Sequence, residues 1–280
     1  MFSEANLRSD QLDAYAYASR KLPEYMHHRL VACPGCDLLY ANPAPEQAAL
    51  ADAYQAADFD SQEEARCASS TYGRLVRGLG LRQRDGALDI GTGEGSFLEQ
   101  LLELGFTNVR GIEPSDAPIA AAAPAIRPLI IRDVFRPADF PPASLSLVTC
   151  FQTIEHVPDP LGLCRASFEL LKPGGALFII CHNRRAFSAR VLGRKSPIFD
   201  LEHLQLFSPR SAELLLERAG FGGIRVRPIL NRYPLHYWAK LFPLPPAAKL
   251  RLLGRLRASR GGSVPIALPA GNLAVVGFKP

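Results

Sequence analysis

Short apolar runs and segments with helical periodicity alternate along the central part of the chain. Each run consists mostly of apolar residues and precedes a stretch in which apolar side chains recur three or four positions apart. Strands that are apolar throughout are typical of a parallel sheet with helices on both faces. The pattern therefore predicts an α/β fold with a doubly wound, mostly parallel sheet. The predicted strands are residues 87–90, 109–113, 128–134, 143–151 and 176–181.

The last part of the chain interrupts this alternation. Residues 223–229 and 272–278 are the predicted last two strands of a seven-stranded sheet, and roughly forty residues separate them, far more than an ordinary hairpin loop needs. Leucines and aromatic residues alternate with Lys and Arg over residues 233–260. We expect a basic, amphipathic helical insert, which packs as a structural element, caps the substrate, or docks on a membrane surface or partner protein. The expected parts are an N-terminal extension (1–60), a core (61–231), the insert (232–271) and a final core strand (272–280).

Cysteines are concentrated in one N-terminal motif and in predicted core elements. Cys33 and Cys36 form a C-x-x-C knuckle, the kind that supplies half of a zinc ribbon. No second pair follows, and His27 and His28 lie too close before the knuckle to match a common finger spacing. We expect a remnant that holds no metal, and we interpret the cysteines in apolar runs as small buried hydrophobic residues.

A glycine loop joins the first predicted core strand to a helix. Glycines occupy positions 91, 93 and 95, directly after the strand that contains Asp89. Glycine lets the backbone approach a small molecule, and the first N–H groups of the next helix are available to contact it. A dinucleotide fingerprint has glycines at the first, third and sixth positions, but the sixth position here is Ser96. The loop predicts a nucleotide-like ligand other than a dinucleotide.

This loop, with Asp89 before it and Glu113 ending the next strand, resembles motif I and the acidic strand of the class I S-adenosylmethionine-dependent methyltransferases. The resemblance implies that the loop contacts the methionine and ribose of the cofactor and that Glu113 binds the ribose hydroxyls. It also implies that Asp133 accepts the adenine amino group while Val134 packs on the ring. The implied contacts with S-adenosylmethionine, or with the product S-adenosylhomocysteine, are Asp89, Gly91, Thr92, Gly93, Gly95, Glu113, Pro114, Asp133, Val134, Phe151 and Gln152.

Further motifs extend the resemblance over residues 72–222. The turn Glu155-His156-Val157 is similar to the corresponding turn of the ubiquinone-biosynthesis-type methyltransferases, and Lys172 opens a Lys-Pro-Gly-Gly phrase. His203 belongs to another phrase that the family places near the substrate opening. The sulfonium already activates the methyl group, so the protein must chiefly position the acceptor and, for a hydroxyl, remove a proton. His156 and His203 are the candidate general bases, with a structural hydrogen-bonding role as the alternative for each. We expect no metal, because acids do not cluster near the fourth strand.

The expected function is methyl transfer to a small molecule, at a hydroxyl of a sugar or another biosynthetic intermediate. A nucleic-acid methyltransferase and a non-catalytic subunit that binds the cofactor are the alternatives. Nucleic acid is disfavoured because no base-handling phrase occurs and the aromatic residues do not alternate with the basic ones.

Charge is distributed unevenly along the 280 residues, whose formal net charge is +5. Residues 1–181 hold 15 Lys and Arg against 23 Asp and Glu, whereas residues 182–260 hold 16 against 4. This asymmetry favours an acidic partner, such as a phosphorylated acceptor, a carrier protein or anionic lipid, and a solvated basic face is the plain alternative. No apolar run approaches the length of a membrane span and the N-terminus lacks a signal pattern, so we expect a cytoplasmic enzyme.

Overall fold

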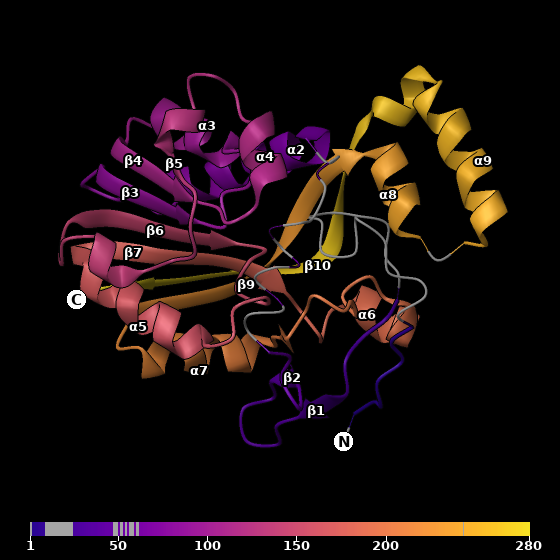
Figure 1. The fold of residues 1–280 in the computed structure, drawn as a ribbon, viewed down its shortest axis with the longest axis horizontal. Helices are drawn as coiled ribbons and strands as arrows, with labels where there is room; N and C mark the ends of the chain where they lie inside the picture. Colours follow the sequence, from indigo (N-terminus) through magenta and orange to yellow (C-terminus); the bar gives the residue numbers. More distant parts are fainter. Residues whose placement is uncertain are drawn as a thin grey trace.

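A central twisted sheet with helices on both faces forms the body of the protein (Figure 1). The computed structural model describes residues 2–8, 25–46, 50, 53, 55, 59, 62–242 and 244–280. The sequence also predicts a short helix over residues 45–57, because Pro is tolerated at a first helical position, and most of these residues lie outside the described ones. None of the described helices is both long enough and apolar enough to span a membrane.

Seven strands form the central sheet in the order β5-β4-β3-β6-β7-β10-β9. The strands from β5 to β7 are parallel, and β10 is antiparallel to both of its neighbours. This arrangement confirms the doubly wound, mostly parallel fold. The strands are β3 (Asp85–Ile90), β4 (Thr107–Ile112), β5 (Ile130–Ile131), β6 (Leu145–Phe151), β7 (Leu171–His182), β9 (Gly222–Pro234) and β10 (Pro265–Phe278).

Helices bury an apolar layer on each face of the sheet. Leu88, Leu147, Val148 and Ile180 are fully buried between the layers, as expected for strands covered on both sides. Figure 1 shows α2, α3 and α4 on one face and α5 and α7 on the other. The helices are α2 (Gln62–Arg77), α3 (Ser96–Glu103), α4 (Asp116–Ala121), α5 (Pro160–Leu170) and α7 (Pro209–Arg218), with 3-10 turns η2 (Arg127–Leu129) and η3 (Pro137–Asp139).

Two of the helices begin at side-chain caps, at positions where a capping residue followed by Pro is typical of a helix start. The Asp159 carboxylate accepts a hydrogen bond from the backbone N–H of Gly162 at the start of α5. The Ser208 hydroxyl accepts one from the N–H of Ser211 at the start of α7. Such caps satisfy N–H groups that have no partner inside the helix, and each contributes about 1 kcal/mol. They fix where the loops after β6 and before α7 end.

The predicted strand bounds are wrong by several residues at four places. Strand β7 begins at Leu171, before the predicted residue 176. Residues 128–134 form only the two-residue strand β5, because η2 occupies its beginning, so Asp133 and Val134 lie in the loop after it. In contrast, β9 and β10 run past the predicted bounds, and Pro234 pairs with Pro265. The chain thus enters and leaves the insert through an extended two-stranded ladder.

The insert contains two helices, α8 (Leu235–Leu241) and α9 (Pro246–Arg257), followed by the 3-10 turn η5 (Arg260–Ser263). Helix α8 contacts the beginning of α2 through two ion pairs. Lys240 Nζ lies 3.9 Å from Glu64 Oε1, with both side chains 7% exposed, and His236 Nε2 lies 3.6 Å from Glu63 Oε2. The insert is therefore anchored to the helix that precedes the first core strand.

A small second sheet joins the N-terminal extension to the body. It has the order β1-β2-β8 and pairs the two sides of the cysteine knuckle with the segment before α7. Asp37, next to the knuckle, forms ion pairs with Arg184 and Arg185 just after β7. The remaining elements are β1 (Leu30–Ala32), β2 (Leu39–Ala41), α6 (Phe187–Leu192), η4 (Gly193–Lys195) and β8 (Gln205–Leu206).

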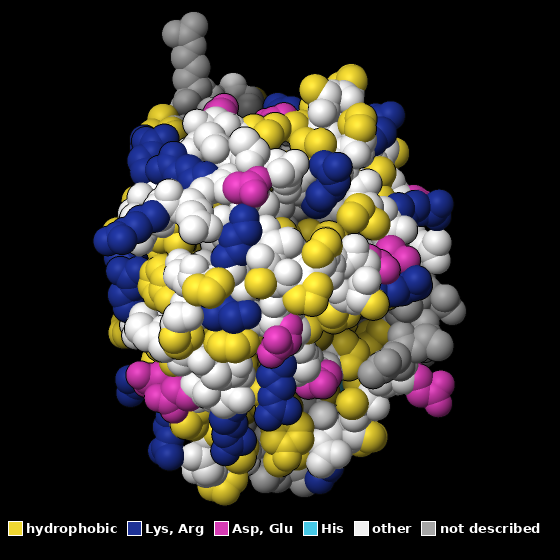
Figure 2. All heavy atoms as spheres, turned by 90° about the vertical axis from the view of Figure 1, so that its left-hand side faces the viewer, with side chains coloured by type: hydrophobic (Ala, Val, Ile, Leu, Met, Phe, Trp, Pro, Cys, Tyr) yellow, Lys and Arg dark blue, Asp and Glu magenta, His cyan; other side chains and the backbone are white. Residues whose placement is uncertain are grey.

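Basic side chains are spread over the face of the protein that lies on the left of Figure 1 (Figure 2). Lys and Arg alternate there with acidic and apolar side chains and do not gather in one patch. This distribution supports solvation of the positive charge on this face.

Candidate functional site

A cavity of about 1420 Å³ lies where the parallel strands end. Loops after β3, β4, β5, β6 and β7 line one part of it, and the insert lines another. In a doubly wound sheet, ligands bind outside the carboxyl ends of the strands where the strand order reverses, which is between β3 and β6 here. Typical ligand pockets have volumes of about 300–1,000 Å³, so this cavity has room for two ligands side by side.

The glycine loop forms one wall of the cavity. Gly91 has a φ of +77°, and a Cβ there would lie 2.2 Å from Thr153 Oγ1. Gly93, with a φ of +58°, faces open space, because no atom lies within 4 Å of its hypothetical Cβ. Gly91 is thus required by close packing against the loop after β6, whereas Gly93 leaves room on the cavity side.

Glu113 follows β4 and holds the glycine loop in place. Its carboxylate accepts hydrogen bonds from the backbone N–H of Gly93 and of Ser115, each at 2.9 Å. The side chain is buried, and burial raises the pKa of Glu113 above its ordinary value. The carboxylate predicted to bind ribose hydroxyls therefore lines the cavity and also orders the backbone around it.

Asp89 lies deeper, on β3. Its Oδ1 accepts a hydrogen bond of 2.6 Å from the Thr149 hydroxyl on β6. The side chain is 3% exposed, and burial raises the pKa of Asp89 to about 7. Asp89 lines the cavity and also links the two strands at which the strand order reverses.

The loop after β5 supplies the part of the cavity that the sequence assigns to adenine. Asp133 Oδ1 accepts a hydrogen bond from the N–H of Val134 and forms an ion pair of 3.1 Å with Arg136. Val134 is 49% exposed at the cavity rim. An exposed apolar side chain beside a carboxylate offers both contacts that the resemblance implies for an adenine ring.

Phe151 and Gln152 form the floor of the cavity between the glycine loop and the part that the insert lines. We call that second part the acceptor part. The Phe151 ring contacts the rings of Tyr72 and Phe97, with centroids 4.8 and 4.7 Å away. The Gln152 amide nitrogen is buried and has no hydrogen-bond partner in the described part of the chain. A buried donor without a partner costs about 1–3 kcal/mol, so this amide is suited to a polar atom of a ligand.

All predicted cofactor residues except Gly95 line the cavity. Gly95 instead precedes α3 with a φ of +78°, and a Cβ there would lie 2.5 Å from Ile126 Cγ2. Its contribution is to let the loop turn into the helix.

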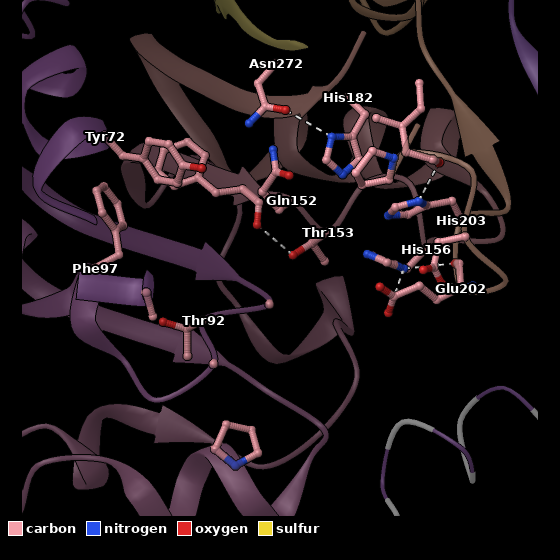
Figure 3. Close-up of a pocket in the computed structure, with 18 of the residues that line it drawn as sticks. Tyr72, Thr92, Phe97, Gln152, Thr153, His156, His182, Glu202, His203 and Asn272 are labelled. Atoms are coloured by element: carbon pink, nitrogen blue, oxygen red, sulfur yellow. Dashed lines mark hydrogen bonds and ion pairs between the residues drawn. The ribbon is translucent and has the colours of Figure 1, made fainter. Parts of the chain in front are cut away.

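Three histidines stand along the wall opposite the glycine loop (Figure 3). We call His156, His182 and His203 the histidine wall. The ring of His203 lies between the other two, with centroid distances of 5.1 Å to His156 and 4.8 Å to His182. The sequence analysis identified His156 and His203 but missed His182, which ends β7 and contacts Asn272 Oδ1 at 3.0 Å. Its position directly after an apolar strand run was the signal that could have identified it.

Hydrogen bonds to backbone carbonyls orient two of these rings. His203 Nδ1 lies 2.9 Å from the carbonyl oxygen of Ile198, and His156 Nδ1 lies 2.9 Å from that of Glu202. Because a carbonyl only accepts, each Nδ1 carries the hydrogen in the neutral ring, and the lone pair is on Nε2. The Glu202 side chain, which the sequence analysis also missed, lies beside both rings in Figure 3.

The fully buried Glu155 links the segments that carry the histidine wall. Glu155 Oε1 accepts a hydrogen bond of 2.6 Å from the N–H of His182, and the Glu155 carbonyl accepts one from the N–H of Leu204. Burial raises the pKa of Glu155 to about 7. The glutamate of the Glu-His-Val turn is therefore structural, because it joins the end of β7 to the segment that carries His203.

The insert lines the acceptor part of the cavity with aromatic and aliphatic side chains. Tyr233 contacts Tyr237 and Trp238, with ring centroids 4.5 and 5.5 Å away. Trp238 is fixed by a hydrogen bond from its Nε1–H to the carbonyl of Ile266. Other apolar lining residues of the insert are Leu241, Phe242, Leu244, Leu252 and Leu256.

The cysteine knuckle lies apart from this cavity. Hydrogen bonds from the backbone and thiol of Cys36 lower the pKa of the Cys33 thiol. Within the part of the chain that the structure describes, no group of three or more metal-ligating side chains includes either cysteine. Cys150, Cys164 and Cys181 are buried in the core, as the apolar pattern predicts.

Sequence comparisons place this geometry in a known family. A family model described as a methyltransferase domain matches residues 47–226. The ubiquinone biosynthesis O-methyltransferase of Pseudomonas aeruginosa strain UCBPP-PA14 is 36% identical over 117 residues, which are 38% of this chain and 49% of that protein. The protein of the same name from Pseudomonas fluorescens strain SBW25 is 34% identical over 114 residues, with the same shares. The chain thus spans about half the length of these curated relatives.

Solved structures share the fold at low sequence identity. A Thermotoga maritima S-adenosylmethionine-dependent methyltransferase, described as a possible histamine N-methyltransferase, has a TM-score of 0.52 and 19% identity, over 77% of this chain and 91% of that one. The YcgJ protein of Bacillus subtilis has a TM-score of 0.54 and 15% identity, over 75% and 98%. Because the methyltransferase-domain match covers well over half of the residues and the fold agrees, the chain belongs to the class I S-adenosylmethionine-dependent methyltransferases.

Proposed function

We propose that the protein transfers the methyl group of S-adenosylmethionine to a hydroxyl of a small biosynthetic intermediate. The observation that carries this proposal is the cavity itself, in which the glycine loop and the histidine wall face one space. A cofactor held by the loop would present its methyl group toward the imidazoles.

The residues present suit the cofactor. Glu113 offers a buried carboxylate for the ribose hydroxyls, Asp133 and Val134 offer a carboxylate and an apolar surface for adenine, and Gln152 offers a buried amide donor. Bound S-adenosylmethionine supplies a methyl group already activated by its sulfonium. The protein must therefore place an acceptor oxygen in line with that methyl group and keep water from competing.

We favour His203 over His156 as the general base that takes the proton of the acceptor hydroxyl. Its Nδ1 faces the Ile198 carbonyl, so the basic lone pair is on Nε2, and the side chain is 7% exposed. His203 Nε2 would take up the proton that the acceptor hydroxyl loses, while the bound cofactor would supply the activated methyl group. A general base of this kind contributes about 100-fold to 10,000-fold.

The lining of the cavity favours one class of acceptor. Aromatic and aliphatic side chains of the insert surround the space beyond the histidine wall, and such a surface is suited to an aromatic or aliphatic body. We therefore favour a hydroxylated acceptor with an apolar body over an unmodified sugar. The matched relatives named as ubiquinone biosynthesis O-methyltransferases are consistent with this choice.

The outer face of α9 supports contact with an anionic lipid surface. Leu250 is 67% exposed, and the neighbouring Arg251 and Arg255 are also exposed. An apolar side chain flanked by arginines is suited to the boundary between headgroups and acyl chains, where a poorly soluble acceptor is found.

Two measurements test the proposal. Calorimetry should show binding of S-adenosylmethionine and S-adenosylhomocysteine and none of NAD. Mass spectrometry of cell extracts incubated with the protein and methyl-labelled cofactor should show a labelled product that a Glu113→Ala variant does not form. Tighter binding of NAD than of both other ligands, or no labelled product with any extract fraction, would contradict the proposal.

A further inference from the structure

We propose that His156, Glu202 and His203 form a binding site for a divalent transition-metal ion. Each of the three contributes a possible ligand atom, and these atoms all lie within 4.8 Å of one another. Two imidazoles and one carboxylate are a ligand set found for zinc in proteins. The lack of a second cysteine pair is a reason to expect no metal at the N-terminal knuckle. It does not apply to this group of side chains.

The possible ligand atoms need to move only a short way to bind one ion together. Zinc bonds of about 2.0–2.2 Å in a tetrahedral arrangement bring ligand atoms to about 3.3–3.6 Å from one another. The possible ligand atoms now lie within 4.8 Å of one another, so they must approach by about 1 Å, which side-chain rotation of Glu202 can supply. The side chains of His156 and Glu202 are 18% and 11% exposed, so an ion there is shielded from water yet reachable through the cavity.

The hydrogen bonds that the two imidazole rings donate through Nδ1 are typical of histidines that bind a metal. A histidine that binds a metal donates its other ring N–H to a carbonyl or carboxylate, which fixes the tautomer and orients the ring. His203 and His156 both do so, to the carbonyls of Ile198 and Glu202 at 2.9 Å. The Glu202 residue would thus serve twice, with its carbonyl behind His156 and its carboxylate on the ion.

The ligand set selects the class of ion. Imidazole nitrogens favour Zn²⁺, Fe²⁺ and Co²⁺, whereas Mg²⁺ and Ca²⁺ require oxygen ligands. Three protein ligands leave a fourth position, which faces the acceptor part of the cavity. An acceptor hydroxyl that coordinates there loses its proton more easily, because the ion lowers the pKa of a bound oxygen. With an ion bound, the proton would pass to solvent and His203 would be a ligand, so the general-base role proposed above applies to the metal-free protein.

The test uses the full chain in a Cys33→Ser/Cys36→Ser background, which removes the knuckle thiols. Zn²⁺ is titrated into metal-free protein by calorimetry, and Co²⁺ is followed by its visible absorption bands. Glu202→Gln and His203→Asn are the test variants. His236→Asn is the matched control, because His236 is also buried, also faces a backbone carbonyl through Nδ1 and lies beside a carboxylate, yet belongs to no three-ligand group among the described residues.

We expect one Zn²⁺ per chain with micromolar or tighter affinity, and tetrahedral Co²⁺ bands. Each test variant should weaken binding by at least about 10-fold and abolish the bands, while His236→Asn leaves both unchanged. Circular dichroism melting checks folding, and His156→Asn replaces any variant that does not fold. No saturable binding up to millimolar Zn²⁺, or equal binding by test and control variants, overturns the proposal. S-adenosylhomocysteine affinity is measured on the same samples, and its retention shows that the methyl-transfer proposal stands independently.

Discussion

The buried carboxylate of Glu155 predicts a pH-dependent stability that a single substitution should remove. Burial raises its pKa from 4.5 to about 7. Below pH 4.5 the carboxyl is protonated in both the folded and the unfolded chain, and its contribution to stability is fully present. As the pH rises through about 7, the unfolded chain ionises first, so the folded state loses stability relative to it.

The size of the effect follows from the two pKa values. Each pH unit between 4.5 and about 7 is worth about 1.4 kcal/mol, so the loss approaches 3 kcal/mol at pH 8. Glu155→Gln cannot ionise, and its amide oxygen can still accept the hydrogen bond from the N–H of His182. Any cost of burying the amide NH₂ is constant with pH. The stability of the variant relative to the parent should therefore rise by about 2–3 kcal/mol between pH 5 and pH 8.

Urea unfolding followed by circular dichroism at both pH values measures this difference. Asp89, whose pKa is also raised to about 7, is present in both proteins and cancels in the comparison. Glu99→Gln, on the exposed side of α3, controls for the chemical change itself. A stability difference between Glu155→Gln and the parent that is the same at pH 5 and pH 8 would refute the reasoning.

Three other predictions address the cofactor, the proton and the knuckle. Glu113→Ala should weaken S-adenosylhomocysteine binding by about 1.5–3 kcal/mol, or about 10-fold to 100-fold, because it removes hydrogen bonds to a charged group. An unchanged Kd by calorimetry in a folded variant would contradict this prediction. His203→Ala should lower turnover of the natural acceptor by about 100-fold to 10,000-fold with nearly unchanged cofactor affinity, and near-full turnover across neutral pH would exclude the role. Cys33→Ser should leave the zinc content by elemental analysis unchanged, because one C-x-x-C pair supplies only two of four ligands; a stoichiometric loss of zinc would show that the knuckle binds it.

Features that depend on neighbouring residues in the sequence could be predicted. The apolar runs marked the buried strands, and the glycine spacing marked the loop that lines the cavity. Asp159 and Ser208 could be identified as caps because a cap depends on only a few adjacent residues.

Features that depend on tertiary packing could not be predicted from the sequence. His182 is an ordinary polar residue in the sequence, and the pairing of β7 with β6 and β10 places it beside His203. Glu202 directly precedes His203, but it lies beside His156 only because its segment packs against the turn after β6. The ladder beyond Ile229 was missed because burial and hydropathy disagree there: Asn231 is buried, whereas Leu230 is exposed. The hydrogen bond from the Ser146 hydroxyl on β6 to the carbonyl of Asp85 on β3 likewise depends on strand pairing.

The ion pair between Lys240 and Glu64 joins two helices that line different parts of the cavity, so we expect a ligand that restrains one helix to restrain the other. Helix α2 places Ser69 and Tyr72 on the cofactor side of the cavity, while α8 places Tyr237 and Trp238 on the acceptor side. Both side chains of the pair are 7% exposed, so moving one helix without the other would leave a buried charge without its counterion. An acceptor that packs against α8 and restrains it would therefore also restrain α2. By thermodynamic reciprocity, the factor by which the acceptor tightens cofactor binding equals the factor by which the cofactor tightens acceptor binding.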